Sequence, residues 1–178
     1  MSFAITNIRC SRLLSQALKM ALLPAALCAD LTASISHATV PVSEVGVFLD
    51  FYISTNGYYW NNTNANDRPW FRTADVCQWK GIECNNNDIN AEQHIIELGD
   101  LGRPGEGLVA NNLNGTIPSS INQLPYLRRV NVSNNRLRGS IPDFSQLTQL
   151  ISIDLSWNQL TGTLPSNLNT LNNLKFFF

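Results

Sequence analysis

Charged side chains are scarce in this chain of 178 residues: Asp, Glu, Lys and Arg make up 14% of it, against about a quarter in an average soluble domain. The 12 Lys and Arg against 13 Asp and Glu give a net charge of -1, so no basic excess is available to neutralise a phosphate backbone and we do not expect nucleic acid as a partner. Histidine occurs only as His37 and His94, both far in sequence from Cys77 and Cys84. We therefore expect no metal centre, and no other cofactor.

Long apolar runs are also missing. The segment Met20–Ala29 is apolar over ten residues and contains a proline, whereas a transmembrane helix needs about 20 apolar residues. The segment ahead of it, Met1–Lys19, carries three basic side chains and no acid, and this order is typical of a secretory signal peptide. Ser36 and Ala38 supply small residues before a cleavage site, so we predict a signal peptide over residues 1–38, with cleavage after Ala29 as the alternative.

Removal of residues 1–38 leaves two cysteines, Cys77 and Cys84. An even number of cysteines in an oxidising compartment predicts one disulfide. We expect the mature protein to be secreted or extracytoplasmic and to contain no membrane span.

Leucine and asparagine, by contrast, are abundant, with 23 and 22 copies, and both recur in a repeated motif. The pattern NxLxGxxP begins at Asn111, Asn135 and Asn158, so its copies follow one another at nearly constant spacing (135 − 111 = 24 and 158 − 135 = 23). The pattern LxxLxLxxN, with Val or Ile at some Leu positions, precedes the second and third copies. A repeat of this length indicates a solenoid, in which each unit stacks on its neighbours.

Each part of the repeat has a structural role. The alternating apolar residues predict a short strand with one side in the core, and stacked strands form one parallel sheet. An Asn side chain both donates and accepts, so Asn111, Asn135 and Asn158 are expected in a buried row that bonds the backbone of the following turn. The motif glycine and proline disfavour a regular helix, so we predict an irregular or 3₁₀ convex side.

These blocks resemble the plant-type leucine-rich repeat of receptor-kinase ectodomains and polygalacturonase-inhibiting proteins. The likeness covers residues 45–178 and implies an α/β solenoid, a short right-handed coil with a parallel concave sheet. It implies a helical, disulfide-bonded N-terminal cap over residues 39–93 and repeats over 94–178, about three full and a fourth incomplete. Residues 75–84 (DVCQWKGIEC) resemble the cap motif of the same family, in which the two cysteines are bridged.

A helix is predicted ahead of the repeats. Its apolar residues at helical spacing are Val45, Phe48, Leu49 and Tyr52. Ser43 is the predicted N-cap and Asn56-Gly57 the predicted stop. Such a helix can cover the first coil, because the open end of a solenoid exposes apolar core. Three tryptophans are expected in the core of this cap, namely Trp60, Trp70 and Trp79.

The first strand of the repeats is predicted at Ile96 and Leu98. Ile96 is separated from the matching Val130 by more than one motif spacing (130 − 96 = 34, against 24 between Asn111 and Asn135), so we predict a ten-residue insertion. The Gly and Pro content of residues 101–110 predicts a loop there.

The residues between the core leucines form columns across the concave face, and they are the predicted ligand-binding residues. The set is Arg129, Asn131, Ser133, Ser152, Asp154, Ser156 and Trp157. A face of mixed charge with an exposed aromatic suits a protein or peptide, with a polysaccharide-associated partner as a further option. Four strands of about five residues present about 300 Å², against about 800 Å² per partner in a standard interface, so binding by this face alone is expected to be weak.

No nucleophile elbow, Walker loop or zinc-binding helix motif occurs, so we do not expect an enzyme. The function predicted is extracellular binding without catalysis. The alternatives are a structural or adhesive surface protein and a truncated ectodomain of a receptor-like kinase. Residues 174–178 begin another strand with no polar closing repeat, so we expect either a longer array or end-to-end self-association.

Overall fold

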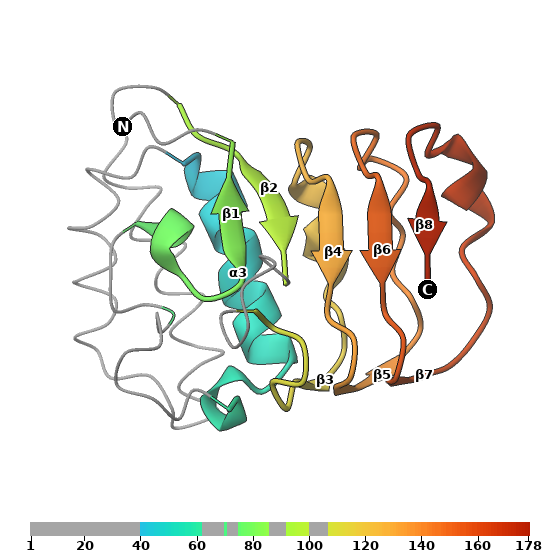
Figure 1. The fold of residues 1–178 in the computed structure, drawn as a ribbon, viewed down its shortest axis with the longest axis horizontal. Coiled ribbons are helices and arrows are strands. Elements are labelled where there is room, and N and C mark those ends of the chain that lie inside the picture. Colours follow the sequence, from blue (N-terminus) through green and yellow to red (C-terminus); the bar gives the residue numbers. More distant parts are fainter. Residues whose placement is uncertain (1–39, 62–69, 71–74, 86–91, 100–106) are drawn as a thin grey trace, which may run out of the picture.

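Successive repeats stack along one axis, with their strands next to one another (Figure 1). The predicted signal peptide and residues 101–106 of the predicted insertion lie outside the residues that the structure describes. The computed structural model describes residues 40–61, 70, 75–85, 92–99 and 107–178.

The concave side is a sheet with the strand order β1-β2-β4-β6-β8. Its strands are β1 (Ile82–Cys84), β2 (Ile95–Leu98), β4 (Arg129–Asn131), β6 (Ser152–Asp154) and β8 (Phe176–Phe177). The last four run parallel, as predicted, while β1 pairs with β2 antiparallel. On the core side, Leu98, Val130, Ile153 and Phe177 align in register. β1 covers the edge that β2 would otherwise expose.

The first parallel strand differs from the prediction in its register. Leu98 pairs with Val130, and Ile95 is buried while Ile96 is half-buried. Ile95 and Leu98 therefore hold the places of Leu127 and Val130, which are also three residues apart. The true separation (130 − 98 = 32) exceeds the motif spacing of 24 by eight, so the predicted insertion of ten residues is wrong by two.

A second parallel sheet, which the sequence pattern did not predict, lies where each repeat leaves the concave sheet (Figure 1). Its strands, in order, are β3 (Asn114–Gly115), β5 (Arg136–Gly139) and β7 (Gln159–Leu160). The Oδ1 atoms of Asn135 and Asn158 accept the N–H of Leu113 and Leu137 in the preceding repeat, both at 2.9 Å. These bonds hold the segment after each motif asparagine close enough to its neighbour for backbone pairing.

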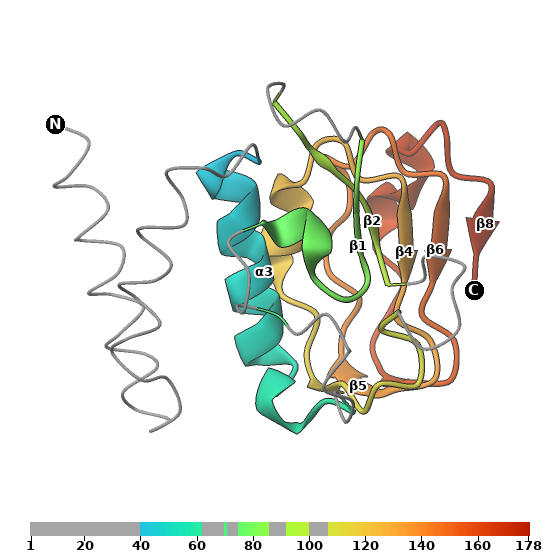
Figure 2. The same cartoon turned by 60° about the vertical axis from the view of Figure 1, so that its left-hand side comes forward.

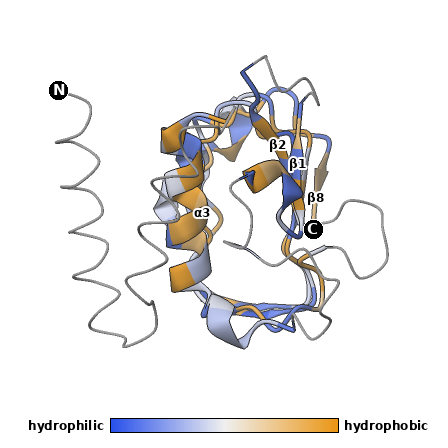
Figure 3. Cartoon of the chain, turned by 90° about the vertical axis from the view of Figure 1, so that its left-hand side faces the viewer, coloured by the Kyte–Doolittle hydropathy of each residue, from blue (hydrophilic) through white to orange (hydrophobic). Residues whose placement is uncertain are grey.

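Two 3₁₀ helices lie on the convex side, as predicted: η4 (Ser119–Gln123) and η5 (Ser166–Thr170). Each follows the motif proline, which fixes φ and removes an N–H donor. The cap helix α3 (Val42–Ser54) packs beside η4, on the side of the coil opposite β2 (Figures 2 and 3). In the cap, α3 thus occupies the position of the convex segment of a repeat.

α3 begins after Pro41, so Ser43 is inside the helix and its prediction as N-cap is wrong. The buried residues of α3 are Glu44, Val47, Phe48, Leu49 and Phe51. The predicted Val45 and Tyr52 are only half-buried. The buried face of α3 includes Glu44 because Oε2 of Glu44 accepts the N–H of Ile95 at 3.0 Å.

Aromatic rings and one disulfide hold the rest of the cap together. Trp60, Trp70 and Trp79 are buried, as predicted. The ring centroid of Trp70 lies 4.9 Å from that of Trp60 and 5.5 Å from that of Trp79. Cys77 and Cys84, predicted as a pair, are bonded, which ties a 3₁₀ turn to β1. The 3₁₀ turns of the cap are η2 (Gly57–Tyr59) and η3 (Val76–Gln78).

Candidate functional site

Outward-facing residues of the concave sheet form two columns across the strands. The register aligns Glu97, Arg129, Ser152 and Phe176 in the first column, and Asn131 and Asp154 in the second. Four of the seven predicted ligand-binding residues therefore lie side by side on neighbouring strands. Apart from Phe176, the two columns form a polar surface, because the apolar residues that alternate with them along the strands point into the core.

Arg129 is exposed and forms an ion pair with Glu97 of the neighbouring strand. Glu97 is only 7% exposed, and a carboxylate so far removed from water needs a charged partner. The pairing fixes the direction of the Arg129 guanidinium. A ligand carboxylate has to compete with Glu97, which is not among the predicted ligand-binding residues.

The second column repeats one hydrogen-bonded unit in successive strands. Oδ1 of Asn131 accepts the Ser133 backbone N–H at 3.1 Å and the Ser133 hydroxyl at 2.7 Å. Oδ1 of Asp154 accepts the same two groups of Ser156 at 3.0 Å and 2.6 Å. Both side chains are therefore held in fixed directions, and the bonds leave the Asn131 amide N–H groups and Oδ2 of Asp154 for a ligand.

Ser133 departs from its predicted role as a surface contact. Its side chain is among the buried polar groups, with 7% of the residue exposed. Its carbonyl accepts the Ala110 N–H at 3.2 Å and the Asn135 Nδ2 at 3.0 Å, which draws the residue into the turn. Ser133 therefore positions Asn131 and is not available to a ligand, whereas Ser156 remains half-buried.

Trp157 is the most exposed of the predicted ligand-binding residues, at 83%. Its backbone has a positive φ of 55°, and so do the equivalent residues Ala110 (53°) and Asn134 (58°) of the earlier repeats. Each of the three residues directly precedes a motif asparagine. Asn tolerates this left-handed conformation better than most residues, and a bulky aromatic tolerates it poorly.

The row of motif asparagines lies between the two sheets. Asn135 is buried, and its Nδ2 donates to the carbonyls of Leu108, Val132 and Ser133 at 2.8 to 3.0 Å. Asn158 repeats this pattern at a half-buried position. Asn111 is buried at the cap end of the row, and its Nδ2 has no hydrogen-bond partner among the described residues. Asn135 and Asn158 therefore organise the turns, as predicted, whereas the Nδ2 of Asn111 does not bond the turn that follows it.

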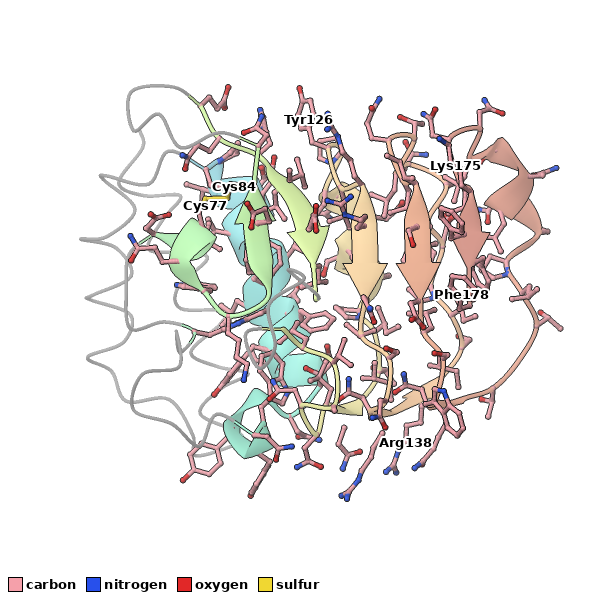
Figure 4. All side chains as sticks on the ribbon, viewed as in Figure 1. Cys77, Cys84, Tyr126, Arg138, Lys175 and Phe178 are labelled. Atoms are coloured by element: carbon pink, nitrogen blue, oxygen red, sulfur yellow. A yellow bond between two sulfur atoms is a disulfide. The ribbon has the colours of Figure 1, made fainter. Side chains whose placement is uncertain are left out.

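An aromatic stack that the sequence pattern did not indicate lies at the end of the concave sheet where β2 and β4 begin. The ring of His94 stacks on that of Tyr126 with centroids 4.0 Å apart. Nδ1 of His94 lies 2.6 Å from Oε1 of the buried Glu44. Tyr126 is exposed at this edge, on the same side as Lys175 (Figure 4). His94 therefore joins the cap helix to the first repeat.

Among the described carboxylates, Asp143 has a pKa that lies clearly below its usual range. The backbone N–H and hydroxyl of Ser145, followed by the amide of Asn167, lower the pKa of Asp143 by hydrogen bonding to its charged form. Asn167 belongs to η5, so this carboxylate links two repeats outside the concave face.

Across the described ranges, no three His, Cys, Asp or Glu side chains gather as a metal site would need. None of the helices in the part of the chain that the structure describes is both long and apolar enough for a membrane span.

Known proteins share this repeat. A family model described as Leucine Rich Repeat matches residues 126–147 and 149–171. These two matched segments are leucine-rich repeats. The chain is 36% identical over 98 residues to phytosulfokine receptor 1 of Arabidopsis thaliana, which covers 54% of this chain and 9% of that protein. It is 46% identical over 112 residues to receptor-like protein 50 of the same plant, covering 50% of this chain and 12% of that protein.

The likeness to plant leucine-rich-repeat receptors is confined to a part of those proteins, since the chain spans roughly a tenth of their length. Among solved structures, the chain superposes on the BIR2 ectodomain of Arabidopsis thaliana with a TM-score of 0.53 and 27% identity, covering 74% of this chain and 63% of that one. The ectodomain of the receptor kinase SOBIR1 has the same fold, with a TM-score of 0.53 over 78% of this chain. The chain is therefore homologous to the leucine-rich-repeat regions of plant receptor kinases and receptor-like proteins.

Proposed function

We propose that this chain is an extracellular binding module that holds a protein or peptide against its concave leucine-rich-repeat face and catalyses no reaction. Two solved relatives support a binding role. One is HAESA, solved in complex with the peptide hormone IDA and the co-receptor SERK1, at 25% identity and a TM-score of 0.53 over 77% of this chain. The other is the BIR3–SERK2 complex, at 26% identity and a TM-score of 0.54.

The observation that carries the proposal is the conformation and exposure of Trp157. A left-handed residue other than Gly or Asn costs about 1 kcal/mol, and an exposed indole gains no burial in return. The equivalent Asn134 is flanked by repeats on both sides and is still exposed, so stacking does not cover this position. An energetically unfavourable residue that is 83% exposed is best explained by a contact outside the chain.

The polar columns supply the remaining chemistry of the proposed site. Arg129 and Asp154 offer opposite charges on neighbouring strands, and Asn131 offers amide donors. Because their directions are fixed by bonds within the face, little side-chain entropy is lost on binding. With an area of about 300 Å², the parallel strands account for a weak complex, and a tight one requires contacts beyond them.

Secretion is part of the same proposal. It rests on the signal peptide expected over residues 1–38, the cap over 39–93 and the disulfide between Cys77 and Cys84. Disulfides persist in oxidising compartments, as an extracellular receptor module requires.

Selection of peptides tests the proposal. A library of random dodecapeptides on phage is selected against the purified chain, and the enriched peptides are measured against three variants. Trp157→Asn and Asp154→Asn are expected to weaken binding at least fivefold. The matched control Ser140→Ala changes an exposed residue of the stack outside the concave sheet and is expected to have no effect. Enrichment only of peptides that bind Trp157→Asn as tightly as the original chain would sink the proposal.

A further inference from the structure

The second sheet carries a band of exposed side chains separate from the concave face. In Figure 1, η2, β3, β5 and β7 follow one another along one edge of the stack. Arg138 points away from the molecule at this edge, on the opposite side from Tyr126 and Lys175 (Figure 4). The exposed residues that form the band are Tyr58, Tyr59, Arg136, Arg138 and Gln159.

Hydrogen bonds make the band continuous from the cap to the third repeat. Nδ2 of Asn112 donates to the carbonyl of Tyr59 at 2.8 Å, which fastens the tyrosines to the first repeat. The guanidinium of Arg138 donates to Oδ1 of Asn114 at 3.0 Å. Arg138 is also in register with Gln159 of β7. The surface is therefore shared by all three motif copies.

The charge of the band has a single sign. Arg136 and Arg138 are the charged residues of η2, β3, β5 and β7, and these elements contain no acid. Within the part of the chain that the structure describes, no carboxylate pairs with either guanidinium. Arg129 on the concave face, by contrast, is paired with Glu97. The band therefore offers two positive charges that a ligand can neutralise.

The aromatic part of the band suits a protein ligand. Tyr58 and Tyr59 are 66% and 62% exposed, and their rings meet edge to face with centroids 5.2 Å apart. Tyrosine and arginine are enriched among the residues that dominate protein interfaces. Their combination here, on elements that contain no acid, favours an acidic protein surface over an apolar or basic one.

We propose that this band docks an acidic, extended segment of a protein partner, independently of the concave face. Arg136 and Arg138 are two residues apart on β5 and are both exposed, so their Cα atoms are about 6.6 Å apart. Side chains at i and i+2 of an extended peptide have the same separation, so two carboxylates at those positions meet both guanidinium groups. Tyr58 and Tyr59 lie in the same band on the far side of β3, where side chains of the partner beside this segment can contact them.

Fluorescence anisotropy at about 20 mM salt, where surface charge is little screened, tests the proposal. The probe is a fluorescein-labelled octapeptide in which glutamate and tyrosine alternate. The double variant Arg136→Gln/Arg138→Gln is expected to weaken binding about tenfold, and Tyr58→Ser/Tyr59→Ser about threefold. The matched control Arg128→Gln/Lys175→Gln removes the same charge from exposed positions at the other edge and is expected to change binding less than twofold. Since all six side chains are exposed, thermal unfolding is expected to remain unchanged.

Three results would overturn the proposal. One is an equal loss of binding in the two charge variants, which would make the effect one of net charge. Another is failure of the octapeptide to bind below about 1 mM or equal binding of its lysine counterpart. The third is a chain that does not bind the octapeptide but binds polygalacturonate, and that loses this binding in Arg136→Gln/Arg138→Gln. That result would assign the band to an acidic polysaccharide. The concave-face variants play no part in this test, so its failure leaves the function proposed for that face intact.

Discussion

Replacing Trp157 by asparagine is expected to stabilise the fold and weaken its binding at the same time. Trp157 has a φ of 55° and is 83% exposed, so the substitution relieves backbone strain and removes almost no packing. The equivalent residue Asn134 shows that asparagine fits this place, with a φ of 58°. The strain relieved is about 1 kcal/mol, which corresponds to a rise in Tm of about 2 to 4 °C for a domain of this size.

Urea unfolding followed by far-UV circular dichroism measures this change without relying on tryptophan emission. The reciprocal variant Asn134→Trp is the matched control, because it places the same side chain in the same conformation one repeat earlier, and a loss of about 1 kcal/mol is expected. A Trp157→Asn variant that unfolds at lower urea than the original chain would refute the reasoning. In that case the indole of Trp157 stabilises the fold, and its exposure is no evidence of an external partner.

Four further substitutions test other parts of the structure. Asn135→Ala removes the acceptor of two backbone N–H groups and the donor to three carbonyls, so urea unfolding should show a loss of about 3 kcal/mol or more. Asn158→Ala, at a half-buried position, should lose less. Gly99→Ala places a Cβ 1.7 Å from the Asn131 carbonyl oxygen at a φ of 121°, and we expect a chain that fails to fold, seen as a loss of near-UV circular dichroism. Because hydrogen bonds lower the pKa of Asp143 in the folded state, its contribution to stability is present above the unfolded pKa of about 3.9 and is lost as the pH falls through the folded pKa. Asp143→Asn should therefore flatten the acid limb of the stability curve, and an unchanged limb below about pH 4 would contradict the assignment.

The repeat and its parallel sheet were predictable because the same residue types return at nearly constant spacing. Alternation of apolar residues specifies which side of a strand is buried, so the core positions of β4 and β6 follow from the sequence. The second sheet was not predictable in this way. Its pairing depends on hydrogen bonds between the side chains of Asn135 and Asn158 and backbone N–H groups of the preceding repeat. A local sequence pattern does not predict these contacts between repeats.

Errors in the cap have a similar origin in long-range contacts. The buried face of α3 was predicted from its apolar residues alone, and Glu44 was left out. The burial of Glu44 depends on His94 and Ile95, about 50 residues later in the chain. The register of β2 was assigned from an alternating apolar pair, although the strand begins with the pair three residues apart, Ile95 and Leu98. On the candidate site, exposure of Ser133 was inferred from strand alternation, which ends where the turn begins.

The indole N–H signal of Trp157 offers the most direct test that this face contacts a partner. The chain has four tryptophans, of which Trp60, Trp70 and Trp79 are buried in the cap. A ¹H–¹⁵N spectrum should therefore contain four indole peaks, one of which disappears in Trp157→Asn. Addition of a selected peptide is expected to shift that peak and leave the other three in place. A peptide that binds without moving the Trp157 peak would contradict the account.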